Sequence, residues 1–352
     1  MTRRTVTGIV ASVLLVALVA VAAVLPVPYV TFSPGPTVDV LAEFDGEEIV
    51  MVSGEQTYRG DGELRLTTVS VTGPTQEITL VQALSAWWDG TRAIYPRDAV
   101  YPDGSTADQV RRESSVQMVS SQDTAVAVAL QELGFDLPRV VEVFDVADGG
   151  PASGALEVGD QVVRVNGTRI TDTASVSEAV QQVGVGEVAT IEVRRNGNTR
   201  VREITTAPSP EDPDTAIVGI VIGPGYDFPF DVGVRIDENI GGPSAGLIFS
   251  LAVYDTLTPG SLTGGRPVAG TGTLTEDGEV GAIGGIPQKI VAAQAEGAEL
   301  FLVPPGNCAE ALGAPGVGKD IELLRAETMS ETVEALAAWA DDPDADLPRC
   351  EG

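Results

Sequence analysis

Apolar and polar positions divide the chain into segments with different periods. The first apolar run, GIVASVLLVALVAVAAVL, extends from Gly8 to Leu25 without interruption by charge. About eighteen apolar residues are just enough for a helix that crosses the hydrocarbon core of a bilayer. We therefore predict that residues 1–30 form a short stub followed by a transmembrane anchor.

The charges that flank this run predict its orientation. Arg3 and Arg4 precede it, and no basic residue follows until Arg59. Cytoplasmic flanks of membrane spans carry an excess of Lys and Arg. We therefore expect a single-pass protein of the cell membrane, with a cytoplasmic N-terminus and all residues after about 30 outside the cytoplasm.

A cleaved signal peptide is the alternative interpretation of the same run. Ala20-Val21-Ala22 offers the small-x-small pattern of a cleavage site. An uncleaved anchor is favoured because the run is long for a signal sequence and because Pro26 and Pro28 follow it directly.

The next segment, residues 31–134, has a weak pattern. Residues 62–71 alternate like a strand, and residues 78–88 have the spacing of an amphipathic helix. Residues 120–134 begin with a helix N-cap signal and end at a glycine, which predicts a second helix there.

Residues 135–207 predict a compact β-rich unit. The expected elements are a strand at 139–146, a short helix, Gly-Asp turn and apolar strand within 149–167, a helix at 175–183, and a hairpin of 187–195 with 199–206 that turns at Asn196-Gly197-Asn198. Residues 207–215, APSPEDPDT, read as a linker.

Strand and helix patterns alternate from residue 216 to 341, which predicts an α/β domain. The expected strands are 231–236, 299–304 and 320–326, the expected helices are 243–256, 286–296 and 330–341, and a hairpin at 266–285 turns at Glu276-Asp277-Gly278. The predicted fold class is thus a multidomain mixture of α+β and α/β units behind a transmembrane helix.

Composition excludes several functions. The sequence has 51 acidic and 21 basic residues, for a formal charge of -30. Such a surface repels nucleic acid, so we expect no nucleic-acid partner. The sequence has no histidine, which excludes a Ser-His-Asp triad, a Cys-His dyad and the usual His-ligated zinc site. We expect no metal and no cofactor.

Lysine is almost absent from a protein whose positive charge comes from arginine. Only Lys289 and Lys319 occur. An amine can lose its proton near neutral pH, whereas a guanidinium cannot. A retained lysine is therefore a candidate for acid–base chemistry, although chance retention explains a single lysine equally well.

The segment GGPSAGL (241–247) places Ser244 where a strand gives way to a helix. Pro243 marks the helix start, and backbone amides around Gly242 and Ala245 would converge there. Such amides suit an oxyanion hole, because a helix N-terminus presents donors to developing negative charge. By itself, a Gly/Ser turn of this kind is more often a helix cap.

The segment GAIGGIPQKIVAAQAEG (281–297) places Lys289 in the first turns of a helix beside Ile286, Ile290 and Val291. Apolar surroundings disfavour the charged amine and lower its pKa, to about 7–8 in some enzymes. A neutral amine of this kind can accept the proton of a serine nucleophile.

Together these two segments resemble the proteolytic domain of the Lon protease family. The likeness extends from about Phe230 to Trp339, within a domain that we place at 216–345. The resemblance implies that Ser244 is the nucleophile, that Lys289 is the general base and that Thr271 hydrogen-bonds near the lysine. It also implies that backbone amides around Ser244 and Ala245 meet the oxyanion. Family members often have Asp where this chain has Gly241.

The stretch GPASGALEVGDQVVRVNG (150–167) resembles the PDZ domains of bacterial proteases. PDZ domains bind the C-terminus of a polypeptide by strand addition, and Leu133-Gly134-Phe135-Asp136 would be the carboxylate-binding loop. Anchor, PDZ domain and Lon-like domain together resemble the PDZ-containing Lon-like proteases of bacterial envelopes. Early strands such as 62–71 could then belong to the protease domain, with the PDZ domain inserted.

Two cysteines, Cys308 and Cys350, could form a disulfide that fixes the C-terminal tail if this part lies outside the cytoplasm. A third motif, GAPGVGKD (313–320), almost matches a nucleotide-binding P-loop, but Asp320 stands where the magnesium-ligating hydroxyl belongs. We therefore expect no nucleotide partner.

The predicted function is ATP-independent serine endopeptidase activity, carried by a Ser-Lys dyad. The substrates would be envelope or unfolded polypeptides that the PDZ domain recruits, and the resemblance implies a hexameric homo-oligomer. The alternative is a non-catalytic PDZ scaffold with an inactive Lon-like domain. A nucleotide hydrolase that depends on Lys319 is a third hypothesis.

Overall fold

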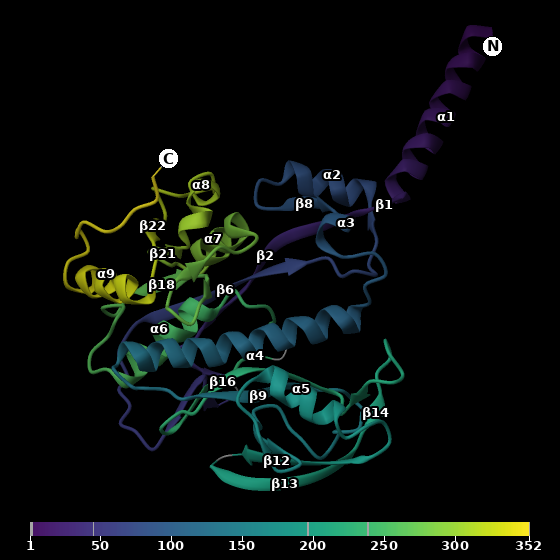
Figure 1. Ribbon diagram of the computed structural model, residues 1–352. Helices are drawn as coiled ribbons and strands as arrows, with labels where there is room; N and C mark the ends of the chain where they lie inside the picture. Colours follow the sequence, from purple (N-terminus) through teal and green to yellow (C-terminus); the bar gives the residue numbers. More distant parts are fainter. Residues whose placement is uncertain (1–2, 45, 196, 238, 352) are drawn as a thin grey trace.

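A computed structural model describes residues 3–44, 46–195, 197–237 and 239–351. Helix α1 (Arg3–Val24) stands apart from the rest of the molecule (Figure 1). None of its residues is buried. In the described part of the protein it is the one helix long and apolar enough to cross a membrane.

The main sheet is built from strands on both sides of residues 135–207. Its order is β22 (Glu322–Arg325), β21 (Leu300–Val303), β18 (Pro267–Gly270), β6 (Glu63–Val71), β2 (Tyr29–Asp39) and β8 (Ala93–Pro96). Strand β18 runs parallel to β6 and β21, and β21 runs parallel to β22, whereas β2 is antiparallel to β6 and β8. The early strand at 62–71 therefore lies beside the strands that follow residue 216.

Alternating residues of this sheet face two separate apolar cores. Leu300 and Leu302 pack with helices α4 (Ala107–Glu132), α6 (Gly246–Leu257) and α9 (Met329–Asp341). Phe301 and Val303 pack with α7 (Ile286–Ala295) and α8 (Cys308–Ala311). Because successive strand residues point to opposite faces, this continuous apolar run marks a strand that is buried on both sides.

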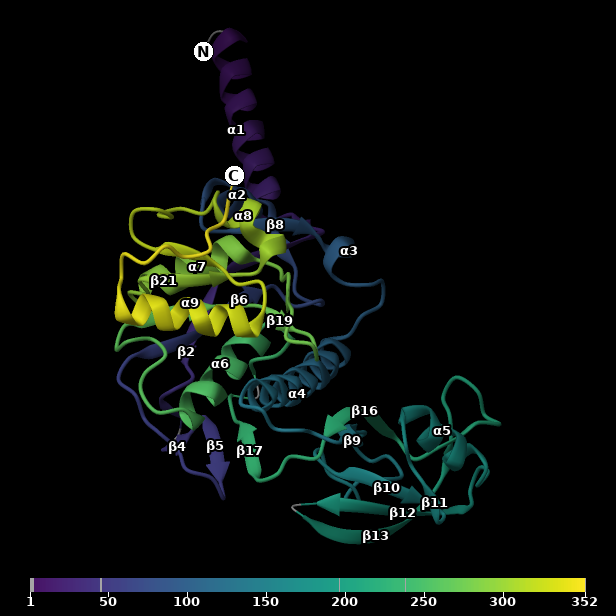
Figure 2. The same ribbon diagram turned by 60° about the vertical axis from the view of Figure 1, so that its left-hand side comes forward.

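A second sheet lies below α4 in Figures 1 and 2. Its order is β13 (Asn198–Thr205), β12 (Val188–Arg195), β10 (Gln161–Val165), β9 (Arg139–Val146) and β16 (Ile220–Tyr226), with β11 (Thr168–Arg169) beside β10. Helix α5 (Thr173–Gln181) covers it, and the two bury an apolar core of their own. The last strand, β16, follows the Pro-rich stretch at 207–215.

Helix α4 connects the two sheets and is longer than the helix predicted at 120–134. It begins after Thr106, where Thr106 and Gln109 form a capping box. Its first half is polar and largely exposed, so no apolar pattern revealed it. The predicted N-cap near residue 120 is therefore wrong and lies inside the helix.

Three further predictions are corrected by the structure. Helix α6 begins at Gly246 instead of Pro243, because residues 243–245 form a turn. The short helix expected within 149–167 is a series of turns with one bridge, Ser153 to Leu156. The hairpin at 266–285 is confined to β19 (Thr273–Leu274) and β20 (Val280–Gly281), since β18 joins the main sheet.

The strands of the hairpin expected around residue 196 pair as β12 and β13, but Asn196 itself lies outside the described residues. The remaining elements are short: β1 (Pro26–Val27), β3 (Glu43–Phe44), β4 (Glu47–Glu48), β5 (Val50–Ser53), β7 (Ile78–Thr79), α2 (Leu80–Trp88), α3 (Arg97–Val100), β14 (Ala207–Pro208), β15 (Ala216–Ile217), β17 (Asp231–Val234) and the 3-10 turn Pro305–Asn307.

The C-terminal tail is fixed to the core that α7 and α8 form on one face of the main sheet. Cys308, at the start of α8, forms a disulfide with Cys350, and their Cα atoms are 5.1 Å apart. The carbonyl of Pro348 accepts a hydrogen bond from the amide of Arg325 in β22. The tail thus runs back along the sheet edge.

Candidate active site

The carbonyl of Ser244 fixes the turn in which this serine lies. The hydroxyl of Thr271 and the amide of Gly272 both donate to it, each at 2.9 Å. The amide of Leu247 in α6 donates in return to the carbonyl of Gly272 at 3.2 Å. The turn before α6 is thereby bound to the segment that leaves β18, and the half-buried side chain of Ser244 has a fixed position.

Helix α4 supports the same turn from the other side. The amide of Gly242 donates to the carbonyl of Ser114 at 3.0 Å, and the hydroxyl of Ser121 donates to the carbonyl of Pro243 at 3.2 Å. A Cβ atom added to Gly241 would lie 2.7 Å from the Cβ of Ser114. This contact explains why a carboxylate side chain has no room at position 241.

Lys289 lies in the first turn of α7, beyond Gly285, whose left-handed conformation begins the helix. The lysine is only 3% exposed. Its Nζ atom is 2.8 Å from the Oγ of Ser244 and 2.8 Å from the Oγ1 of Thr271. The structure therefore brings together the three side chains that the sequence singled out.

Burial lowers the pKa of Lys289 to about 7, because the charged amine is removed from water. The directions of the hydrogen bonds are also constrained. Thr271 donates its hydroxyl proton to the carbonyl of Ser244, so it must accept from the lysine amine. A neutral amine has one lone pair, which is then free to face the serine hydroxyl.

The predicted oxyanion donors differ in whether their amides already have an acceptor. The amides of Ser244 and Ala245 have no acceptor among the described residues, whereas the amide of Gly242 is engaged by Ser114. Pro243 has no amide hydrogen. Ser114 and Ser121 escaped the sequence analysis because they lie more than a hundred residues before Ser244 in a polar stretch.

A cavity of about 700 Å³ opens beside the serine and the lysine. Its wall is largely apolar and comes from β2, β6, α4 and the segment before the serine, including Phe32, Val38, Leu66, Val69, Met118 and Ile240. The cavity is large enough for several side chains of an extended peptide.

The predicted carboxylate-binding loop lies away from any groove of the second sheet. Leu133 and Phe135 pack against the core formed by α4, α6 and α9 on the main sheet, and the Phe135 ring lies 5.7 Å from that of Phe230. The predicted loop of Leu133, Gly134, Phe135 and Asp136 is therefore not placed to bind a ligand, because its apolar side chains are used in core packing.

A groove does lie between α5 and β16, with a volume of about 320 Å³. Strand β16 ends the order of the second sheet among the residues described. The lining includes Val176, Val180, Ile220, Ile222, Arg112 and Asp145. The sequence offered one sign of this groove, the apolar-Gly-apolar run at 218–220, which lines it at the start of β16. The same pattern occurs at 133–135, so it did not distinguish the two places.

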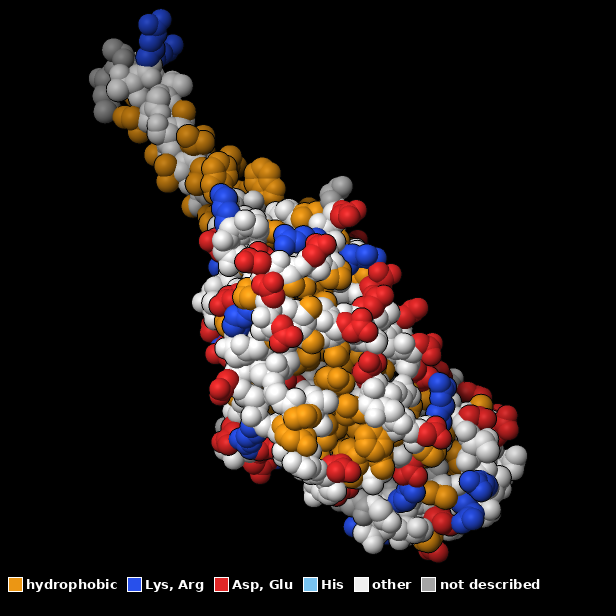
Figure 3. All heavy atoms as spheres, turned by 90° about the vertical axis from the view of Figure 1, so that its left-hand side faces the viewer, with side chains coloured by type: hydrophobic (Ala, Val, Ile, Leu, Met, Phe, Trp, Pro, Cys, Tyr) orange, Lys and Arg blue, Asp and Glu red, His pale blue; other side chains and the backbone are white. Residues whose placement is uncertain are grey.

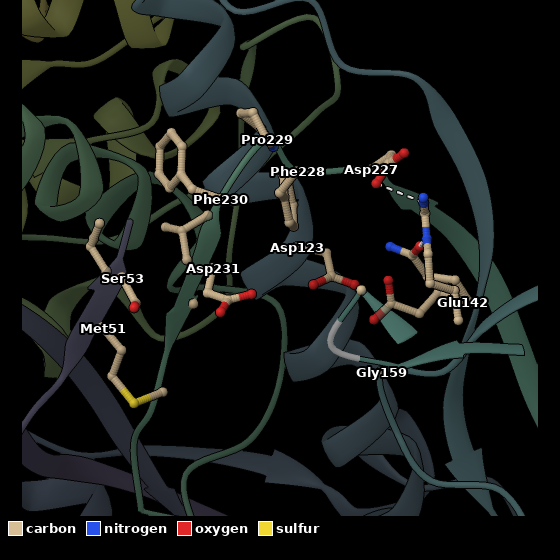
Figure 4. Close-up of a pocket in the computed structure, with 16 residues that line it drawn as sticks. Met51, Ser53, Asp123, Glu142, Gly159, Asp227, Phe228, Pro229, Phe230 and Asp231 are labelled. Carbon is tan, nitrogen blue, oxygen red and sulfur yellow. Dashed lines mark hydrogen bonds and ion pairs between the residues drawn. The ribbon is translucent and has the colours of Figure 1, made fainter. Parts of the chain in front are cut away.

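A third cavity, of about 660 Å³, lies where the two-stranded sheet of β5 and β17 approaches the second sheet and α4 (Figure 4). The carboxyl groups of Asp123 and Glu142 face one another in it. Burial and the adjacent Glu142 carboxyl raise the pKa of Asp123, and burial raises that of Glu142. Nearby, Asp227 forms an ion pair with Arg194 at 2.6 Å. The cavity lies apart from the dyad and shares no lining residue with its cavity.

Comparisons with known proteins match both sheets. The family model of the PDZ domain matches residues 114–206, and that of the Lon protease (S16) C-terminal proteolytic domain matches residues 238–338. The PDZ match begins inside α4, well before the predicted limit at 135. Both matches together leave the N-terminal strands of the main sheet uncovered.

Several curated proteins are similar over parts of the sequence. Lon protease 1 of Thermus thermophilus is 32% identical over 120 residues, covering 32% of this chain and 14% of that protein. The Lon protease of Clostridioides difficile is 28% identical over 190 residues, covering 51% and 23%. A probable periplasmic serine endoprotease DegP-like of Pseudomonas putida is 34% identical over 83 residues, covering 23% and 17%.

The chain therefore spans less than a quarter of the length of each of these three relatives. Among solved structures, the PDZ domain of an SdrC-like protein of Listeria monocytogenes is 20% identical, with a TM-score of 0.22, and the match covers 24% of this protein and 86% of that one. The similarities support a serine peptidase. The protein has a PDZ domain and a Lon-type C-terminal proteolytic domain, preceded by one N-terminal apolar helix.

Proposed function

We propose that this protein is an ATP-independent serine endopeptidase in which Ser244 and Lys289 form the catalytic dyad. The observation that carries the proposal is the buried amine of Lys289, which lies 2.8 Å from the serine Oγ and has a pKa lowered to about 7. An amine with such a pKa is neutral in a large fraction of molecules near neutral pH, which is the state that a general base needs.

The reaction is acyl transfer in two halves. Lys289 accepts the Oγ proton while Oγ forms a bond to the peptide carbonyl carbon. The protonated amine then gives that proton to the leaving peptide nitrogen as the C–N bond breaks. In the second half, Lys289 takes a proton from water, the hydroxide oxygen attacks the ester, and the proton returns to Ser244. The amides of Ser244 and Ala245 would stabilise the oxyanion in each half.

The substrate would be an extended polypeptide. The apolar cavity beside Ser244 suits side chains of an unfolded segment. The groove between α5 and β16 would recruit a C-terminal tail by adding it as a strand to β16. Helix α1 would hold the enzyme in the cell membrane with both domains outside the cytoplasm.

Digestion of casein by the full-length protein in detergent tests the dyad. We expect cleavage by the wild type with or without ATP, and none by Ser244→Ala or Lys289→Ala. Full cleavage by both variants would refute the dyad. A wild type that cleaves no protein, but binds C-terminal peptides in the groove, would favour the alternative of a non-catalytic PDZ scaffold.

Two other expectations have direct tests. Sedimentation of the detergent-solubilised protein would show whether it forms the hexamer that the Lon resemblance implies. The P-loop-like segment at 313–320 has an exposed lysine, Lys319, and is followed by strand β22 instead of the helix that a nucleotide site requires. Nucleotide binding that disappears in Lys319→Ala would therefore contradict the proposed function.

A further inference from the structure

Helix α2 exposes an apolar face to solvent. Trp88 is 86% exposed, Trp87 is 74% exposed, and Leu84 and Val81 are each more than half exposed. At 3.6 residues per turn these four side chains fall within an arc of about 120°. Ala83 and Ala86 form the buried side of the helix (their exposures are 8% and 1%). Two adjacent tryptophans in water are unfavourable, which indicates a surface that something covers.

The place of α2 in the fold identifies what covers it. Helix α1 ends at Val24, and the next strand, β1, pairs with β7 immediately before α2, with Val27 opposite Ile78. The amide of Leu80, the first residue of α2, donates to the carbonyl of Leu25 at 3.0 Å. The start of α2 is therefore hydrogen-bonded to the backbone just where it leaves the apolar helix.

The figures show the same continuity on the surface. In Figure 1, α2 lies at the base of α1, on the end of the main domain from which α1 projects. In Figure 3, hydrophobic atoms continue from the projecting helix onto the adjoining end of the body. An apolar surface that continues from a membrane-spanning helix fits the bilayer better than it fits a separate protein.

Other aromatic residues lie on the same end of the molecule. Tyr29 in β2 and Tyr95 in β8 are 40% and 38% exposed, and they occupy neighbouring positions in the register of these two strands. Trp and Tyr side chains are enriched where a membrane meets water, because one part of each ring system is apolar and another is polar. Helix α2 itself carries no charged residue.

We propose that α2 is an interfacial helix whose apolar face, Val81, Leu84, Trp87 and Trp88, lies in the headgroup region of the bilayer that α1 spans. This proposal rests on the proposed anchoring role of α1. The partner is a lipid surface, and the net charge of -30 makes zwitterionic lipid a better partner than anionic lipid.

Such an attachment fixes the protease domain relative to the membrane at two points. The loop after α2 also contacts the helix of the catalytic lysine, since the side-chain amide of Gln288 donates to the carbonyl of Thr91 at 3.4 Å. The helix of Lys289 is therefore joined to the segment that follows the proposed membrane-contacting helix.

Tryptophan fluorescence of the full-length protein in phosphatidylcholine vesicles tests the proposal. The sequence has three tryptophans, and Trp339 is only 3% exposed, so Trp87 and Trp88 report on α2. Lipids with bromine at shallow positions of the acyl tail should quench most of the emission, and deep bromines should quench less. The variant Trp87→Phe/Trp88→Phe should keep only emission that bromine does not quench.

Flotation of the vesicles after an alkaline wash measures insertion of α1 separately. A protein that floats, yet whose α2 tryptophans escape bromine quenching, overturns the α2 proposal while leaving the anchor intact. A protein that does not float overturns the anchor itself. Emission that bromine does not affect, but that shifts with the protein-to-lipid ratio, would assign the face to a second copy and equally overturn the proposal.

Discussion

Lys289 owes its lowered pKa to burial. The sequence predicted the direction of this pKa shift, because the neighbours of Lys289 in the predicted helix are apolar. The pattern of residues alone does not bring the amine to Ser244 and Thr271, since the three residues lie in separate segments, and only the resemblance to Lon proteases implied these contacts. The lysine-poor composition supplied the signal, and the resemblance to Lon proteases supplied the roles.

The pH dependence of cleavage tests the state of this lysine. The neutral amine is the active form, so kcat/KM should rise with pH and level off above an apparent pKa of about 7. Lys289→Arg should lose activity by on the order of 10³-fold at every pH, because arginine keeps its proton. Initial rates on an unfolded substrate from about pH 5 to 9 check both, a range that brackets this pKa. A wild-type profile that is flat over this range would contradict the prediction.

Thr271 should act by orienting the amine. Thr271→Val removes the acceptor of the lysine proton and should lower kcat by roughly 10- to 100-fold, with little change in KM. Thr271→Ser keeps the hydroxyl and should restore most of the activity. Steady-state kinetics of the two variants decide the matter, and a valine variant as active as the serine variant would exclude an orienting role.

Helix α4 shows what local patterns cannot reveal. Only its second half is apolar, so the sequence predicted a helix of about half the true length, although the capping box at Thr106 was readable. Its contacts with the turn at 241–243 join segments more than a hundred residues apart. No periodicity encodes such a contact, and the same limit explains why the sequence pattern alone points to a carboxylate-binding loop at 133–136, although the groove lies between α5 and β16.

Contact between α4 and the serine turn should make two small residues interdependent. Gly241→Ala places a Cβ 2.7 Å from that of Ser114 and should displace Ser244, lowering kcat by roughly 10-fold or more. Ser114→Gly alone should have little effect on kcat. The double variant should regain most of the lost activity, because the clash disappears. Independent, additive effects in this double-mutant cycle would show that the contact does not position the serine.

The buried carboxyls of Asp123 and Glu142, on α4 and β9, should influence stability against pH. Burial raises both pKa values in the folded state, so the folded protein binds protons more tightly than the unfolded protein. Stability from this pair is therefore present at low pH and is lost as pH rises from the unfolded values near 4 through the raised folded values.

Asp123→Asn removes one of these charges and should raise the Tm at about pH 7 by roughly 2–4 °C. Near pH 3.5, below the unfolded pKa of about 3.9 for Asp, the same variant should show little or no gain. Asp160, the other charge that acts on Glu142, is paired with Arg195 at 2.5 Å and is left unchanged. Calorimetry at the two pH values provides the measurement, and an equal shift at both would rule out a titration effect.

At the scale of the whole molecule, the sequence builds one domain from two distant pieces. Strands β2 and β6 precede the PDZ domain, whereas β18, β21 and β22 follow it, and all lie in one sheet. The sequence predicted three strands of this sheet, β6, β21 and β22, and the resemblance implied that early strands could join the protease domain, whereas β2 and β8 were missed and β18 was assigned to a hairpin. It could not predict their order, because parallel pairing of β6 with β18 depends on tertiary packing.

This interleaved architecture predicts which pieces can fold. A fragment of residues 216–352 lacks β2 and β6, so apolar faces of β18 and α6 would be exposed, and we expect no cooperative unfolding transition. By contrast, Arg139 and Tyr226 are paired across β9 and β16. Replacing residues 140–225 by a short Gly-rich turn should therefore leave a folded domain that cleaves a short peptide through Ser244.

The shortened protein should lose efficient cleavage of long unfolded proteins, because the groove between α5 and β16 is gone. Urea unfolding of the fragment and of the shortened protein, with peptide and casein assays of the latter and its Ser244→Ala form as control, separates these effects. Cooperative unfolding of the 216–352 fragment would show that the early strands are dispensable. Undiminished casein cleavage by the shortened protein would show that the PDZ groove recruits nothing.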